Sequence, residues 1–294
     1  MGLALLTGCT QSSNSQLLSI NEVPAVTLSE VTTDSNLRVV AFANGSAEII
    51  SALGMKSVLV GRDIASTEAN LLDIPVVSAG HQIVPEKVIS LSPDVVLIDA
   101  ASGPKSAIAT LEKFGINVIS IRESWTLADI AGKVGDIANA LEVPERGDNL
   151  IAKIQAKITS SPAPEIADKK VAFLYLRGTS SIYLIGGPGS GADALIGAAG
   201  AIDIGAAQLG QPFNPMTSEV LAASDPDILL VMTKGIESVG GVNSLIELPG
   251  IAQTSAGKFR RIIAVDDSLL LSFGPRTPSL ILELRKAMVA VMAP

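Results

Sequence analysis

Histidine and cysteine are scarce in this chain, which has one of each among its 294 residues. Protein zinc sites take three or four ligands, mostly from these two residue types, so a zinc or manganese site is disfavoured. A single cysteine also excludes an internal disulfide and a multi-cysteine iron–sulfur cluster. With no second histidine and no nucleophile–base pair in view, an enzyme is disfavoured as well.

Positive charge and long apolar runs are also lacking. The net charge of −8 argues against nucleic acid as a partner, because nucleic-acid binding needs basic patches. No run of 18 apolar residues exists, so no segment is expected to span a bilayer. The chain is instead rich in aliphatic residues, at 48% hydrophobic but only 3% aromatic, which is typical of layered α/β domains. Its length allows one large or two medium domains.

The single cysteine, Cys9, has the context of a bacterial lipoprotein processing site. It follows Leu5-Leu-Thr-Gly8 and precedes the polar run Thr10-Gln-Ser-Ser-Asn-Ser15. We expect Cys9 to carry a lipid that anchors the protein to the outer face of the cell membrane, with residues 1–35 as signal remnant and flexible tether. No Lys or Arg precedes Cys9 and the apolar segment is short, which suggests a start codon placed too far downstream. The alternative is a free cysteine near a disordered terminus.

From Arg38 onward, short β-branched runs alternate with amphipathic stretches, which predicts parallel sheets covered by helices. Residues 124–160 interrupt this alternation with apolar positions at helical spacing, and Pro144 begins a second helix or kinks the first. We therefore predict an N-terminal α/β lobe at 36–123, an interdomain helix at 124–160 and a C-terminal α/β lobe at 161–294.

An internal repeat supports two related lobes. The pattern of residues 86–98, a short helix, Pro-Asp and an apolar strand, recurs at residues 219–231. Residues 47–54 likewise resemble residues 193–200. Each similarity alone is weak, but both occur in the same order on either side of the helical segment. The predicted fold is α/β, with two Rossmann-like lobes joined by a long interdomain helix and a ligand in the cleft between them.

Three residues suggest what that ligand is. Imidazole and phenolate are both axial ligands of haem iron, and the chain offers His81 in a loop and Tyr175 in a predicted strand. Arg177 lies two residues after Tyr175, so both side chains face the same side of the strand, where the cation favours the phenolate. The competing interpretations are a solvated loop histidine, a core tyrosine and a surface arginine.

The chain resembles the helical-backbone class of ABC-importer substrate-binding proteins, which serve cobalamin, iron-siderophores and haem. The resemblance covers about residues 36–294 and rests on Gly45-Ser-Ala-Glu48-Ile, Leu91-Ser-Pro-Asp94 and Gly274-Pro-Arg-Thr-Pro278. Within the class it is most similar to the haemin-binding lipoproteins of Gram-positive bacteria, through Gly80-His81 and Phe173-Leu-Tyr175-Leu-Arg177.

The resemblance implies a monomeric carrier, not an enzyme, that delivers haem for iron uptake to an ABC permease and its ATPase. His81 and Tyr175 would hold the iron from opposite faces, with Arg177 supporting the tyrosine. Arg276 would either contact a haem propionate or fix its own loop.

Glu48 and Glu219, one in each lobe, would dock into arginines of the permease. Their simpler role is to complement the dipoles of the helices that they begin. Trp125 is expected to line the cleft or the core, and Tyr183 to be pocket wall or core. The alternative ligand is cobalamin or a ferric siderophore.

Overall fold

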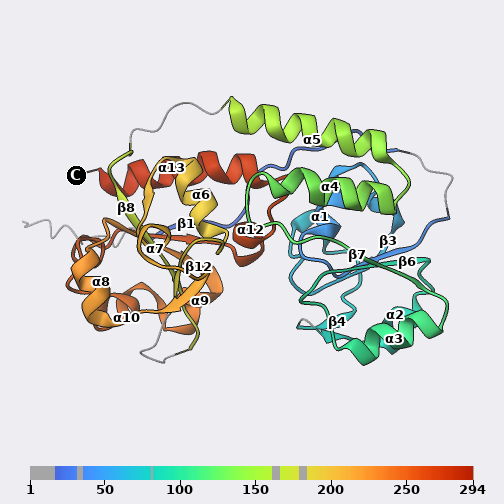
Figure 1. Ribbon diagram of the computed structural model, residues 1–294, viewed down its shortest axis with the longest axis horizontal. Coiled ribbons are helices and arrows are strands. Elements are labelled where there is room, and N and C mark those ends of the chain that lie inside the picture. The colour runs from blue at the N-terminus through green and yellow to red at the C-terminus, as the bar shows by residue number, and fades with distance from the viewer. Residues whose placement is uncertain (1–16, 32–35, 81, 161–165, 179–183, 294) are drawn as a thin grey trace, which may run out of the picture.

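The computed structural model describes residues 17–31, 36–80, 82–160, 166–178 and 184–293. Two α/β lobes lie side by side, and a layer of long helices runs along one edge of both (Figure 1). The predicted fold class is confirmed. Cys9, His81 and Tyr183 lie outside the described residues.

The N-terminal lobe is built on a parallel four-stranded sheet in the order β3-β2-β6-β7. Its strands are β2 (Val39–Ala41), β3 (Leu59–Arg62), β6 (Val95–Ile98) and β7 (Asn117–Ser120). The helices are α1 (Ser46–Ala52), α2 (Pro85–Ser90) and α3 (Lys105–Lys113), with short 3-10 turns at Lys56–Val58 and Ala69–Leu71. Strands β4 (Ser78–Ala79) and β5 (Gln82–Ile83) form a small hairpin. The apolar β2 and β6 are buried, as expected for parallel strands covered on both faces.

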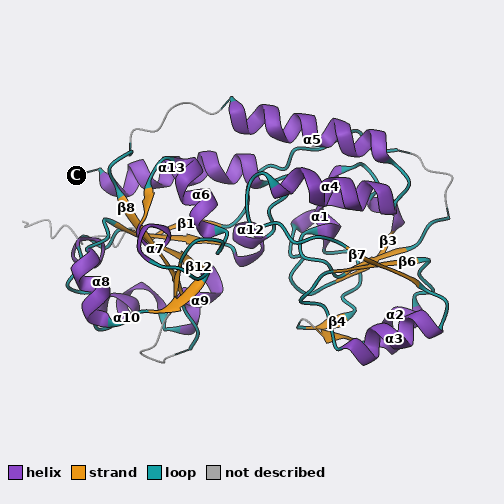
Figure 2. Cartoon of the chain, viewed as in Figure 1, coloured by secondary structure: helices purple, strands orange, loops and turns teal. Residues whose placement is uncertain are grey.

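The C-terminal lobe contains a larger mixed sheet in the order β1-β13-β12-β8-β9-β11, with β10 paired to β8. Figure 2 shows strands of this sheet, among them β1, β8 and β12, surrounded by the helices of the lobe. Its strands are β1 (Leu17–Ile20), β8 (Lys170–Tyr175), β9 (Leu184–Gly186), β10 (Ile202–Asp203), β11 (Phe213–Pro215), β12 (Ile228–Met232) and β13 (Ile262–Val265). Its helices are α6 (Ala192–Ala199), α7 (Ile204–Gln208), α8 (Ser218–Ser224), α9 (Thr233–Ser238), α10 (Gly241–Glu247), α11 (Ser255–Lys258), α12 (Asp267–Leu271) and α13 (Thr277–Met292). Phe173 on β8 is fully buried in its core.

The segment between the lobes consists of two helices, α4 (Asp129–Ala140) and α5 (Pro144–Thr159). Pro144 begins α5, at a position where a backbone N–H would make no hydrogen bond within the helix. Pro144 therefore begins a second helix, as one of the two expectations stated, and does not kink the first. The two helices pack closely, because a Cβ added to Gly147 would lie 2.6 Å from the Cβ of Ala138. Their apolar faces belong to a single hydrophobic cluster that continues through α13 into both sheets.

Residues 17–31 correct the prediction that the chain up to residue 35 lies outside the fold. Strand β1 pairs in parallel with β13 and forms one edge of the C-terminal sheet. Backbone N–H groups beyond β1 donate to carbonyls of both lobes: Val26 to Pro275 (2.9 Å), Leu28 to Ala52 (2.8 Å) and Val31 to Gly54 (3.0 Å). The segment therefore crosses from one lobe to the other as a second covalent connection.

Candidate functional site

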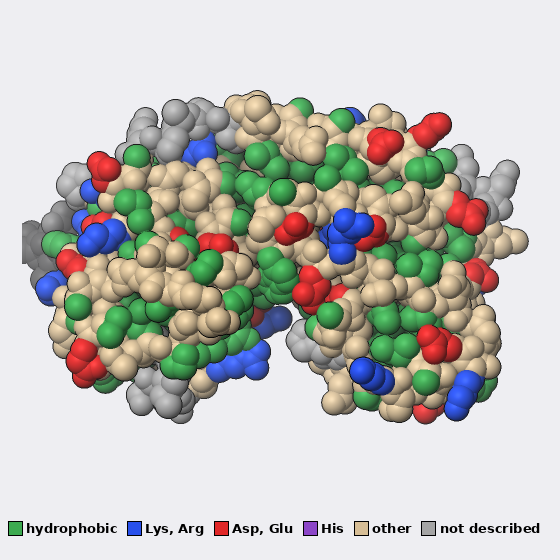
Figure 3. All heavy atoms as spheres, in the orientation of Figure 1, with side chains coloured by type: hydrophobic (Ala, Val, Ile, Leu, Met, Phe, Trp, Pro, Cys, Tyr) green, Lys and Arg blue, Asp and Glu red, His purple; other side chains and the backbone are tan. Residues whose placement is uncertain are grey.

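A cavity of about 400 Å³ lies between the two lobes, where the space-filling view is notched (Figure 3). Its walls are the segments that directly follow β2, β3, β6 and β7 in one lobe and β8, β12 and β13 in the other. Both sheets thus point the carboxyl ends of their parallel strands at the same space. This is where α/β sheets bind ligands, and the cavity has the size of a small-molecule site.

Tyr175 and Arg177 form a bonded pair on the C-terminal wall of the cavity. The Nε of Arg177 donates to the Tyr175 hydroxyl at 2.7 Å, and its Nη2 donates to the same oxygen. The ring of Tyr175 rests edge-on against Phe213, with centroids 5.3 Å apart. The prediction that the two side chains face the same way is confirmed, and both residues line the cavity at the end of β8.

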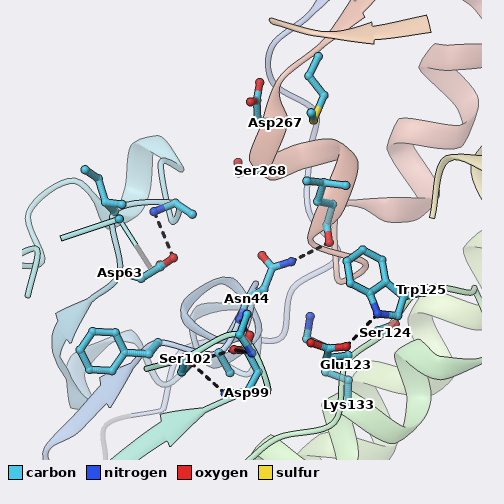
Figure 4. A pocket seen from close by; sticks show the side chains of 18 of the residues that line it. Asn44, Asp63, Asp99, Ser102, Glu123, Ser124, Trp125, Lys133, Asp267 and Ser268 are labelled. Carbon is cyan, nitrogen blue, oxygen red and sulfur yellow. Dashed lines mark hydrogen bonds between the residues drawn. The ribbon is translucent and has the colours of Figure 1, made fainter. Parts of the chain in front are cut away.

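The N-terminal wall carries acidic side chains whose carboxylates accept hydrogen bonds from residues of the surrounding loops (Figure 4). The carboxylate of Asp99 accepts from the backbone N–H of Asn44 at 2.7 Å and from the Ser102 hydroxyl at 2.8 Å. Asp63 accepts from the hydroxyl of Ser66, and burial raises the pKa of the Asp63 carboxyl. These bonds shape the wall and leave it with negative charge.

The only tryptophan of the chain, Trp125, lines the cavity, which is one of its two expected positions. Its indole N–H donates to Glu123 at 3.1 Å, so the ring is fixed at the wall (Figure 4). A tryptophan beside a ligand site is a fluorescence probe of whatever binds there.

Sequence reasoning missed Lys133, which lies on α4 at the floor of the cavity. It is 3% exposed, and its ammonium donates to the carbonyl of Ser272 in the C-terminal lobe at 2.8 Å. Burial lowers its pKa to about 8, although Glu48, Asp99 and Glu123 act in the opposite direction. The sequence does hold a signal, because Lys133 falls at i+3 from Ile130 on the apolar face of the helix.

Behind the cavity, Arg276 joins the two lobes through two carboxylates. Its Nη2 lies 3.1 Å from Glu48 and 2.6 Å from Glu68, and its backbone N–H donates to Glu48 at 2.9 Å. All three side chains are less than a tenth exposed. Arg276 precedes α13, whereas both glutamates belong to the N-terminal lobe, so this buried cluster is a polar contact across the junction.

This cluster corrects two predictions made from the sequence. Glu48 is 4% exposed and bound to Arg276, so its carboxylate is inaccessible to arginines of another protein. Arg276 is 5% exposed and does not line the cavity, so it fixes its own loop rather than contacting a propionate. The physical reason is the same for both: each group's charge is compensated inside the protein.

Glu219 is exposed in the first turn of α8, as a docking residue must be. The internal repeat matches Glu219 not with Glu48 but with Glu86, and Glu86 is exposed in the first turn of α2. The repeat therefore held the signal for a second exposed glutamate that sequence reasoning passed over.

Glu68 should make the folding stability depend on pH. Burial and the neighbouring Glu48 raise the pKa of Glu68 to about 7, above the ordinary value of 4.5, although Arg276 acts against them. Between these two values the folded protein holds a proton that the unfolded chain has released, so the free energy of unfolding falls as pH rises. Glu68→Gln removes this titration. We expect the free energy of unfolding of the variant, relative to the wild type, to be higher at pH 8 than at pH 5.

Urea denaturation at the two pH values measures this difference. The exposed Glu112→Gln is the matched control and should show no such pH dependence. An effect of Glu68→Gln that is equal at pH 5 and pH 8 would show that Glu68 does not hold the proton.

Among the described residues, no group of three or more His, Cys, Asp and Glu side chains is placed to hold a metal ion. No helix within the described ranges is long and apolar enough to cross a membrane.

Two sequence relatives of the chain are named as binding proteins. It is 25% identical over 245 residues to the uncharacterized ABC transporter substrate-binding lipoprotein YvrC of Bacillus subtilis, covering 81% of this chain and 76% of YvrC. It is 26% identical over 151 residues to the vitamin B12-binding protein of Vibrio campbellii, covering 51% of this chain and 54% of that protein.

Solved structures of similar fold include haem binders. The periplasmic heme-binding protein RhuT from Roseiflexus sp. RS-1 matches with a TM-score of 0.79 and 35% identity, over 87% of this chain and 99% of RhuT. The heme-binding protein HmuT matches with a TM-score of 0.79 and 28% identity, over 93% and 98% of the two chains. Solved variants of HmuT replace an arginine, a histidine or a tyrosine by alanine.

A family model described as periplasmic binding protein matches residues 39–269, which include most of both lobes and the segment between them. These proteins bind a substrate rather than transform it, which agrees with a cleft built from two sheets. The chain belongs to the periplasmic binding protein family and is a substrate-binding protein, not an enzyme.

Proposed function

We propose that this protein binds haem in the cleft between its lobes and delivers it to an ABC importer. The observation that carries the proposal is Tyr175, which lines the cavity at the end of β8 and whose hydroxyl accepts a hydrogen bond from Arg177 at 2.7 Å. Phenolate oxygen is an axial ligand of ferric haem, and the guanidinium of Arg177 donates to the Tyr175 oxygen through both Nε and Nη2. The heme-binding protein HmuT has been solved with an arginine, a histidine or a tyrosine replaced, and Arg177, His81 and Tyr175 are of these residue types.

His81 is the proposed second axial ligand. It follows Gly80, which lines the cavity from the N-terminal lobe, whereas Tyr175 lines it from the C-terminal lobe. A flat ligand held by His81 and Tyr175 would have one protein group on each face. The cavity also offers apolar surface from Phe42, Ile64 and Met232, which suits the porphyrin ring.

Delivery requires contact with a permease. We propose that Glu219 docks on arginines of the permease, and that the partner glutamate in the other lobe is Glu86 rather than the buried Glu48. Both are exposed in the first turn of a helix, one in each lobe. A lipid on Cys9 would hold the protein at the outer face of the membrane, as the lipoprotein relative suggests.

Cobalamin is the second candidate ligand, because a vitamin B12-binding protein is among the sequence relatives. Cobalamin brings its own axial ligands to the metal, so binding it would not need Tyr175. Binding of a ferric siderophore would likewise not need Tyr175.

Absorption titration of the wild-type protein with ferric haemin, cyanocobalamin and a ferric siderophore tests the proposal. Haem delivery predicts a saturable shift of the haemin spectrum, quenching of Trp125 fluorescence and no binding of the other two ligands. Cobalamin binding with an unshifted haemin spectrum would replace the haem proposal with the second candidate.

A further inference from the structure

The two walls of the cavity differ in charge. The N-terminal wall presents the carboxylates of Asp63, Asp99 and Glu123. Two cations also line this wall. The buried Lys133 already interacts electrostatically with three carboxylates, and the guanidinium of Arg122 is bonded to Asp136 through both Nε and Nη2. A ligand carboxylate placed on this wall would meet like charge at close range.

The opposite wall has a net positive charge. Arg177 and Lys234 contribute two cations, and Asp267 is the carboxylate beside them. One oxygen of Asp267 is occupied by the backbone N–H of Lys234, which donates to it at 3.1 Å. Within the part of the chain that the structure describes, the ammonium of Lys234 has no carboxylate within 4 Å and no hydrogen-bond acceptor.

A second hollow of about 220 Å³ adjoins the cavity on this wall, and the two share Tyr175, Arg177, Met232, Lys234 and Asp267. The hollow lies between the segment after β8 and the first turn of α9. These segments are tied together where the Gly178 N–H donates to the Ser238 hydroxyl at 3.0 Å. Arg177 and Lys234, which belong to these two segments, therefore line one small hollow together.

We propose that this hollow is a carboxylate subsite, in which Lys234 and Arg177 bind a propionate of the haem whose iron lies at Tyr175. The inference rests on the proposed function and deepens it by assigning the acidic edge of the ligand to the C-terminal wall. Arg177 already donates to the Tyr175 hydroxyl through Nε and Nη2, so Lys234 supplies the uncommitted charge. A carboxylate accepts from an ammonium at short range, and the contact is stronger than one between neutral groups.

Haemin and its dimethyl ester distinguish a carboxylate contact from a general effect on the cleft. The ester keeps the iron and the ring but has no ionised propionate. Both ligands are titrated, in the same detergent-containing buffer, into the wild type and into Lys234→Gln, Lys234→Arg and the control Lys258→Gln. Lys258 is exposed on α11 and does not line the cavity.

We expect Lys234→Gln to raise the Kd for haemin about fivefold, as one partly exposed charge pair contributes, and to leave the Kd for the ester unchanged. Lys234→Arg should restore haemin binding, and Lys258→Gln should bind both ligands like the wild type. An equal change for haemin and ester, or no change for either, would overturn the subsite. Failure of the wild type to bind haemin would instead overturn the proposed function, and the subsite with it.

Discussion

Arg276→Met should lower the free energy of unfolding by about 3–5 kcal/mol, because it removes one partner of a buried charge cluster and leaves two carboxylates behind. Arg276 lies 3.1 Å from Glu48 and 2.6 Å from Glu68, with side chains between 5% and 8% exposed. Without the Arg276 side chain, Glu48 keeps the hydrogen bond from the backbone N–H of residue 276, but neither glutamate has another cation within 4 Å among the described residues. Urea denaturation at pH 8, followed by Trp125 fluorescence, measures the loss.

Two variants separate uncompensated charge from lost packing. Glu48→Gln and Glu68→Gln combined with Arg276→Met neutralise all three groups, and we expect this triple variant to recover most of the lost stability. Lys286→Met breaks the exposed pair with Glu283, where both side chains are at least 40% exposed, and should cost less than about 1 kcal/mol. If the triple variant were as unstable as Arg276→Met, the cost would come from packing and not from charge.

The cluster also bears on how the lobes move. Lys133 donates to Ser272, and Asn44 donates to Leu271, so the segment before Arg276 is also bonded to α4 and to the N-terminal lobe. The chain connects the lobes covalently twice, through residues 17–31 and through the segment after α5. The hydrogen bonds and the Arg276 cluster add polar contacts across the same junction. Such a junction favours small changes in the opening of the cleft over a wide swing.

The fold could be predicted because its signals are local. Short apolar strands and helical periodicity are read within a few residues, and the period of a strand places Tyr175 and Arg177 on one side. Strand β1 could not be predicted in this way. Leu17–Ile20 is four residues long and pairs with residues 262–265, and its own composition does not indicate which strand it pairs with.

The missed parts of the site share this non-local origin. Glu48 and Arg276 are 228 positions apart, and Glu68 and Arg276 are 208 positions apart. A glutamate in the first turn of a helix is usually exposed, which made Glu48 look accessible. In α1, however, the surrounding Ala47, Ile49 and Ile50 are fully buried, so no side of that turn faces solvent.

Removing the Tyr175 hydroxyl is expected to have the largest effect on haem binding. Tyr175→Phe keeps the ring and its edge-on contact with Phe213, and takes away only the oxygen that Arg177 holds. Changes to groups that merely support a metal ligand cost about 10- to 100-fold in affinity, so loss of the ligand itself should raise the Kd for ferric haemin about 100-fold or more. Arg177→Gln should cost about tenfold, because it weakens the support and keeps the oxygen.

The matched control for this prediction is Phe213→Leu, which alters the packing behind Tyr175 but leaves its oxygen bonded to Arg177. A ligand role requires that Tyr175→Phe change both the Kd and the haemin spectrum, while Phe213→Leu leaves the spectrum as in the wild type. Unfolding midpoints of the three variants show whether each protein is intact, since the hydroxyl is not part of the core. Wild-type affinity and spectrum in Tyr175→Phe would mean that the iron is held elsewhere. The cavity would then be a porphyrin site without a phenolate, or the site of a ligand that brings its own metal ligands.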